Sequence, residues 1–71
     1  MSEIGHRIKI LRTERNLKQC ELADLIRANG QKISNSMICH IENGNKGLSI
    51  RVATAIAHAL GVTLDDIVSV N

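Results

Sequence analysis

The 71-residue sequence contains no phenylalanine, tryptophan, tyrosine or proline. Without aromatic side chains there is nothing on which the bases of single-stranded DNA or RNA can stack, so a single-strand-binding protein is disfavoured. Isoleucine, leucine and alanine supply most of the apolar residues, and together with the lack of proline they favour short helices over a sheet sandwich with tight turns. We therefore expect an all-α fold.

Cysteines and long apolar runs are also scarce. Cys20 and Cys39 are too few for a disulfide framework, and no leader-like segment opens the chain, so we expect a reduced, cytoplasmic protein. No apolar run reaches the ~18 residues that a membrane span needs. The length suits one domain, residues 1–71, whose modest core would compete with a deep cofactor or substrate pocket. For this reason we expect no enzyme activity and no cofactor. We also expect no metal site, because the spacing of Cys and His matches no known ligand motif.

Charge is unevenly distributed, although the net charge is only +2. Residues 1–51 contain nine basic and five acidic residues, whereas residues 52–71 contain two acidic residues and no basic one. The basic surface is therefore expected in the first part of the chain, and the C-terminal end is expected to be acidic and apolar.

Asn and Gly residues divide the chain into five expected helices. Apolar residues recur at helical spacing in the first, second and fourth of them. We expect the second helix to run from about residue 19 to residue 27 or 28. The three apolar faces consist of Ile4, Ile8 and Leu11; of Leu22, Ala23, Leu25 and Ile26; and of Ile50, Ala53, Ile56, Ala57 and Leu60.

Residues that cap helix ends mark the last three helices. Ser34 and Ser49 stand at N-cap positions, Thr63 and Asp66 are spaced as a capping box, and Gly61 suits a helix C-terminus. We expect the third helix to end at residues 41–42 and the fifth to cover residues 64–69. Two apolar pairs are placed to pack across these caps, namely Ile33 with Ile38 and Val62 with Ile67.

The order and spacing of several short motifs resemble one known family. The motifs are Ile4-Gly5, Arg7-Ile8, Leu11-Arg12, Leu17-Lys18-Gln19, Glu21-Leu22-Ala23, Ile38, Ile41-Glu42-Asn43-Gly44 and residues 57–62. Together they resemble the lambda-repressor and Cro-like helix-turn-helix family, also called the xenobiotic-response-element type. The resemblance implies a compact five-helix bundle that binds double-stranded DNA through its second and third helices. It also implies a transcriptional regulator, which we expect to be a repressor and a homodimer.

The third helix, about residues 35–42, is the expected recognition helix. Ile38 and Ile41 would face the core, which leaves short polar side chains that can reach base edges in the major groove. An ordinary solvated surface is the alternative, but such surfaces usually carry long Lys or Glu side chains. Cys39 and His40 are adjacent and diverge by about 100° around the helix, so together they make a poor metal site. The resemblance places base contacts on Asn35, Ser36 and, near the helix end, Cys39 or His40.

Phosphate contacts are expected on both sides of this helix. Gln19 matches the backbone-anchoring glutamine of the family, and the start of its helix adds amide donors. A solvated surface charge is the alternative for each lysine. The remaining candidates are Asn43, Asn45 and Lys46 after the third helix, with Lys18, Lys32 and Arg51 as further basic residues.

The resemblance also pairs Arg12 with Glu42, which would brace the first helix against the third. The sequence departs from the family in two places. Lys18 stands at an N-cap where relatives often carry Thr or Asn, which costs about 1 kcal/mol unless another group replaces the cap. The stretch 24–32 is too long for a compact turn and predicts a long second helix followed by a loop at residues 29–32.

Two copies of the chain are expected to pair, because one short recognition helix covers too few base pairs to select a genomic site. Val68 and Val70 are the expected dimer interface, and the C-terminal segment brings no Lys or Arg to it. A frayed tail is the alternative. For the whole protein, the alternatives are an antitoxin, a restriction-modification controller, or a protein-interaction module that has lost DNA binding.

Overall fold

The computed structural model describes residues 3–44 and 48–68, and these residues form five α-helices without any strand. The predicted all-α fold class is confirmed. No helix among the described residues is long and apolar enough to cross a membrane. The helices are α1 (Glu3–Glu14), α2 (Gln19–Ala28), α3 (Asn35–Glu42), α4 (Ile50–Leu60) and α5 (Leu64–Val68).

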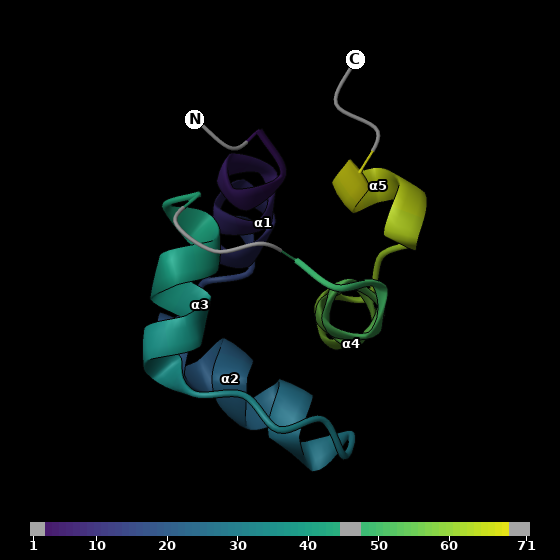
Figure 1. Ribbon diagram of the computed structural model, residues 1–71. Helices are drawn as coiled ribbons and strands as arrows, with labels where there is room; N and C mark the ends of the chain where they lie inside the picture. The colour runs from purple at the N-terminus through teal and green to yellow at the C-terminus, as the bar shows by residue number, and fades with distance from the viewer. Residues whose placement is uncertain (1–2, 45–47, 69–71) are drawn as a thin grey trace.

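The helices pack around one core, with α1 beside α3 and with α2 crossing beneath them in the view of Figure 1. The α2 helix also packs on α4, and α5 closes the other side against α1 and α4. Side chains from all five helices meet in the middle, and six large apolar ones are almost completely shielded from solvent. These six are Ile8, Leu22, Ile26, Ile38, Ile56 and Ile67.

The predicted caps are present in the structure. The hydroxyls of Ser34 and Ser49 accept hydrogen bonds from the backbone three residues later, at 3.1 and 3.2 Å. Thr63 and Asp66 bond each other reciprocally, at 3.0 and 3.2 Å. Gly61 ends α4 with φ 71°, a left-handed conformation that a Cβ disfavours. Local side-chain chemistry therefore fixes where α3, α4 and α5 begin.

Two predicted core positions are wrong. Ile50 is 72% exposed and Leu25 is 41% exposed. Ile50 is the first residue of α4, and a helical side chain leans toward the N-terminus, so this side chain extends past the core. Leu25 lies more than about 100° around α2 from the centre of the buried arc formed by Leu22, Ala23 and Ile26.

The helices α1 and α3 approach each other closely at Gly5. This residue is buried, and a methyl group placed on its Cα would lie 2.2 Å from the carbonyl oxygen of Ile41. Because that oxygen belongs to backbone, it cannot swing aside as a flexible side chain would. Only glycine therefore allows α3 to lie where it does against α1.

The start of α2 shows how the chain compensates for Lys18 at the N-cap. The ammonium group of Lys18 has no acceptor to offer the helix backbone. The carboxylate of Glu21 reaches back and accepts a hydrogen bond from the Lys18 backbone N–H at 2.8 Å. Half of a capping box is therefore present.

The connection between α2 and α3 is long, as predicted. The α2 helix continues to Ala28, and six residues separate it from Asn35, the first residue of α3. A compact helix-turn-helix uses a turn of about three or four residues.

Candidate nucleic-acid interface

The outward face of α3 carries only short, uncharged or weakly basic polar side chains. Ile38 and Ile41 point into the core, with 0% and 3% exposure, and this orientation turns the opposite face to solvent. The only carboxylate on α3, that of Glu42, is buried. Of the predicted base-contacting residues, Asn35, Ser36 and His40 are exposed and Cys39 is half-buried.

Cys39 and Asn43 are tied together at the end of this face. The Asn43 side-chain amide donates a hydrogen bond to the Cys39 sulfur across 3.4 Å. This contact fixes the orientation of the Asn43 amide one turn beyond the centre of α3. Within the described part of the chain no three His, Cys, Asp or Glu side chains gather as a possible metal site.

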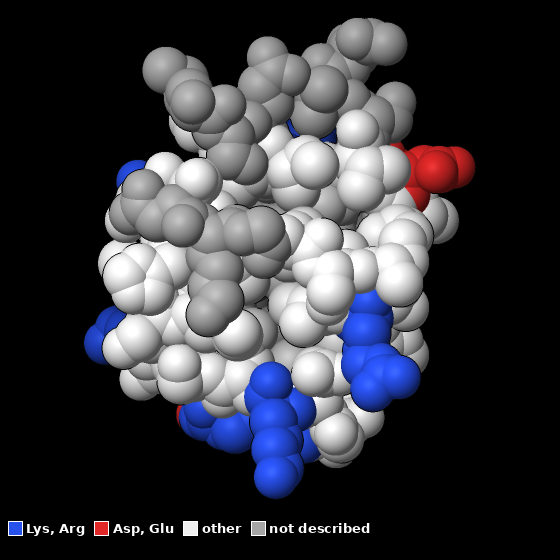
Figure 2. Space-filling model, in the orientation of Figure 1, with Lys and Arg blue, Asp and Glu red and all other residues white. Residues whose placement is uncertain are grey.

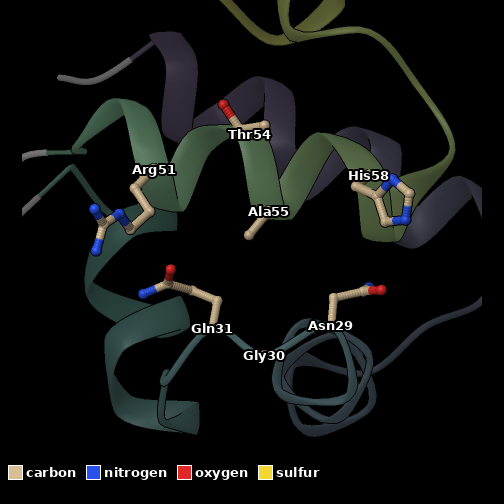
Figure 3. Close-up of a pocket in the computed structure, with 7 residues that line it drawn as sticks. All are labelled: Asn29, Gly30, Gln31, Arg51, Thr54, Ala55 and His58. Carbon is tan, nitrogen blue, oxygen red and sulfur yellow. The ribbon is translucent and has the colours of Figure 1, made fainter.

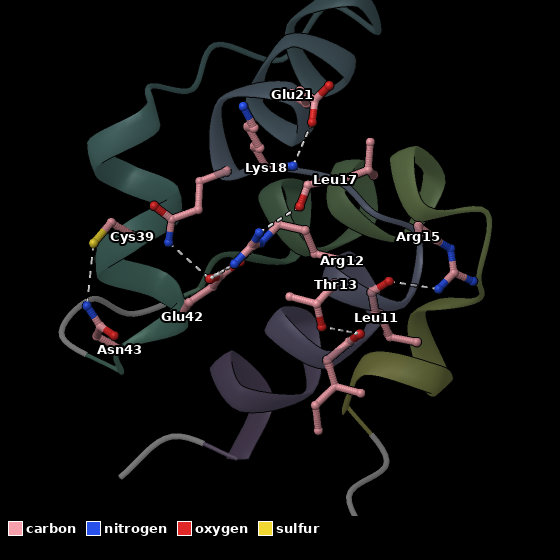
Figure 4. A network of polar contacts seen from close by, with 12 residues as sticks. Leu11, Arg12, Thr13, Arg15, Leu17, Lys18, Glu21, Cys39, Glu42 and Asn43 are labelled. Atoms are coloured by element: carbon pink, nitrogen blue, oxygen red, sulfur yellow. Dashed lines mark hydrogen bonds and ion pairs between the residues drawn. The ribbon is translucent and has the colours of Figure 1, made fainter.

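Arg12, Glu42 and Gln19 form a network of hydrogen bonds beneath the outward face of α3. Figure 4 shows Arg12 and Glu42 pointing toward each other. The guanidinium of Arg12 bonds both carboxylate oxygens of Glu42, at 2.6 and 3.0 Å. It also donates to the Leu17 carbonyl at 2.7 Å. The side chains of Arg12 and Glu42 are only 10% and 1% exposed, so the expected pair is a buried, two-point ion pair.

Gln19 joins this network by donating its side-chain amide to Glu42 Oε1 at 3.1 Å. The side chain is half-buried at the first position of α2. One amide N–H is therefore held by Glu42, and the other stays available to an external acceptor. Glu42 thus fixes the direction of the residue that sequence analysis assigned to a backbone phosphate. This bond between Gln19 and Glu42 was not predicted.

The other predicted phosphate contacts are spread over three elements. Lys18 is exposed before α2, Lys32 is exposed in the α2–α3 connection, and Arg51 is exposed in the first turn of α4. Asn45 and Lys46 lie outside the described residues. In Figure 2 the blue Lys and Arg side chains in the lower half of the view lie over α4 and the α2 region, while the prominent red group lies over α5. Most of the positive charge visible on this face therefore lies away from the prominent acidic group, as the charge distribution along the sequence predicts.

Arg51 lines an open groove between α4 and the α2–α3 connection (Figure 3). The groove has a volume of about 340 Å³. Gln31 lies across the groove from Arg51, and the sequence alone predicts no role for it. The excess length of the connection was the only signal in the sequence that could have directed attention to it.

The predicted dimer surface is described only at α5. Val68 is 41% exposed at the end of this helix, and Val70 lies outside the described residues. A basic residue from another helix lies at this end, because Arg7 of α1 donates to the Asp66 carbonyl at 2.9 Å. Packing of α1 against α5 brings this arginine to the acidic end.

The carboxyl group of Asp66 has a lowered pKa. A hydrogen bond from the Thr63 backbone N–H, followed by the Thr63 hydroxyl and the charge of Arg7, holds the pKa of Asp66 below its ordinary value of 3.8. This carboxylate is therefore ionised at neutral pH and belongs to the cap of α5.

These features define a class of protein. Five short helices place a small polar recognition face on α3, braced by a buried ion pair, and this arrangement is that of a helix-turn-helix DNA-binding domain. A helix-turn-helix family model matches residues 8–67, so the chain belongs to the lambda-repressor/Cro-like helix-turn-helix family. This is a non-enzymatic family of DNA-binding transcription regulators. No significant match to a curated protein or to a solved structure was found.

Proposed function

We propose that this chain is a transcriptional repressor that binds double-stranded DNA as a homodimer and inserts α3 into the major groove. The observation that carries the proposal is the outward face of α3, where Asn35, Ser36 and His40 are exposed and no long charged side chain is present. Short polar groups of this kind can approach base edges in a groove about 12 Å wide.

Base readout is assigned to the first turn of α3. Asn35 is exposed at the first helical position, and an asparagine amide matches the N6 and N7 edge of adenine with two hydrogen bonds. Ser36 lies beside it, and His40 lies about one turn further along. Cys39 is half-buried, so it presents less of its surface to a base than these three residues do.

Phosphate contacts on either side hold the helix in register. Gln19 offers its free amide N–H and the backbone amides of α2 on one side. Asn43 follows α3 on the other side, with Asn45 and Lys46 next in the sequence. These contacts set position and affinity but carry no sequence information.

The test uses a duplex recovered by selection from a random-sequence pool. Asn35→Ala should weaken binding to that duplex by about 1–3 kcal/mol and leave binding to unrelated DNA nearly unchanged. Competition titrations at one fixed salt concentration measure both affinities. Equal losses on the two DNAs would remove Asn35 from base readout.

Dimerisation is assigned to the surface around Val68. A protein this small gains specificity by covering two half-sites, whose centres are then about 10 base pairs apart. Sedimentation should show two protein chains per saturated duplex, and Val68→Asp should leave one chain per duplex. One wild-type chain per duplex would overturn the dimer. Because Val68 is exposed, the aspartate costs the monomer little stability, so loss of pairing is separable from unfolding.

A further inference from the structure

Arg51 differs from the other arginines of the chain. Of the five arginines, four donate hydrogen bonds from their guanidinium groups to carbonyl or carboxylate oxygens of the protein. These four are Arg7, Arg12, Arg15 and Arg27. The guanidinium of Arg51 makes no hydrogen bond or ion pair with the residues that the structure describes. Its five donors are therefore available to a ligand.

The groove beside Arg51 places a second donor near it. Figure 3 shows the side chains of Arg51 and Gln31 at the same end of the groove, on the side where α3 lies. Asn29 and His58 mark the opposite end, and Ala55 lies between. The Gln31 amide makes only a long hydrogen bond of 3.4 Å, to the Lys32 carbonyl.

The lining of the groove selects for negative charge. No Asp or Glu lines it, and none lines the adjoining groove beneath Arg27 and Lys32. A guanidinium and a neutral amide can both donate hydrogen bonds to the oxygens of a phosphate group. Of the two groups, only the guanidinium also contributes a positive charge. The groove is open along its length, which suits a polymer that passes over it better than a small molecule that needs enclosure.

We propose that Gln31 and Arg51 together bind one backbone phosphate of the DNA duplex whose major groove α3 enters, and we call this pair the clamp. The proposal rests on the proposed function and deepens it. It gives the long α2–α3 connection a purpose, since this connection supplies Gln31 to the groove. A free phosphoryl group has the same chemistry, and the experiment separates the two sources.

The test measures how much each backbone phosphate contributes to binding of the selected duplex. Single phosphates are replaced in turn by uncharged methylphosphonate, and affinity is measured for wild type, Arg51→Ala, Gln31→Ala and the control Lys9→Ala. Lys9 is exposed on α1, so its variant removes the same charge away from the groove. All three substituted side chains are at least partly exposed, and circular dichroism verifies that each variant is folded.

We expect one phosphate whose replacement weakens the wild type and Lys9→Ala but affects neither groove variant. Arg51→Ala should lower affinity about tenfold, and Gln31→Ala about threefold. The dependence of log affinity on log salt should decrease by roughly one unit for Arg51→Ala and stay unchanged for the neutral Gln31→Ala.

Three results would overturn the clamp. In the first, Gln31→Ala keeps the phosphate sensitivity that Arg51→Ala loses. In the second, neither variant differs from Lys9→Ala while the same motif is still selected, which leaves the proposed function standing. In the third, inorganic phosphate shifts the Gln31 side-chain amide resonance but the selected duplex does not, which assigns the groove to a free phosphoryl group. Failure to select any motif would instead refute the proposed function.

Discussion

Replacing Arg12 with alanine should strongly destabilise the fold, because the change leaves a buried carboxylate without its counter-charge. The Glu42 side chain is 1% exposed and accepts two hydrogen bonds from Arg12. In Arg12→Ala only the Gln19 amide would remain on that carboxylate. The variant also loses the bond to the Leu17 carbonyl, which ties the end of α1 to the approach to α2.

The magnitude follows from burial. Removing one partner of a buried ion pair costs about 3–5 kcal/mol. The whole free energy of unfolding of a domain with this many residues is roughly 4–10 kcal/mol. We therefore expect Arg12→Ala to lose between a third and nearly all of its stability, with a correspondingly lower midpoint in urea.

Urea denaturation followed by circular dichroism measures this loss. The matched control is the double variant Arg12→Met/Glu42→Leu, which removes both charges and fills the space with apolar groups, so most of the stability should return. Arg12→Lys should fall between wild type and Arg12→Ala, since an ammonium group cannot bond both carboxylate oxygens in the same fork geometry. Wild-type stability in Arg12→Ala, or a double variant as unstable as the sum of Arg12→Ala and Glu42→Leu, would refute the bracing role.

Two further predictions concern Gly5 and Asp66. Gly5→Ala should destabilise the fold by about 3 kcal/mol, because its methyl group would meet the Ile41 carbonyl oxygen at 2.2 Å. Thermal unfolding measures this loss, and a midpoint within error of wild type would contradict the close approach. Asp66 has a lowered pKa, so its contribution is fully present above pH 3.8 and is lost as pH falls through the still lower folded pKa. Asp66→Asn should therefore flatten the acid side of the stability profile, measured by urea titrations at several pH values, and an identical profile in both proteins would exclude this linkage.

Much of the fold could be predicted because its determinants are local. The caps at Ser34, Ser49 and Thr63 act within three residues of themselves, and their hydrogen bonds are those expected from the sequence. The extension of α2 to Ala28 follows from the number of residues available before Ser34. Local rules therefore fixed the helix boundaries well.

What depends on packing could not be predicted. Periodicity alone placed Leu25 and Ile50 in the core, but which flank of a helix is covered depends on its neighbours. The Gly5 contact and the approach of Arg7 to Asp66 join helices far apart in the sequence. No local pattern encodes such distances.

The candidate interface divides in the same way. The exposed face of α3 follows from the burial of Ile38 and Ile41, which the sequence pattern predicted. Two other features could not be predicted, because they depend on how helices and a loop are placed relative to one another. They are the hydrogen bond from Gln19 to Glu42 and the position of Gln31 across the groove from Arg51. Sequence therefore indicates which side chains are available for DNA, and the structure indicates how they are held.

Selection of duplexes by the folded wild-type chain from a random-sequence pool tests most directly the claim that the outward face of α3 reads DNA sequence. The account predicts one enriched, nearly palindromic motif, and it predicts that Asn35→Ala relaxes the preference at one base pair in each half-site while the rest of the motif persists. A pool that stays random after repeated rounds with folded protein would contradict the claim. A motif that is identical for wild type and a variant lacking the Asn35, Ser36 and His40 side chains would contradict it equally.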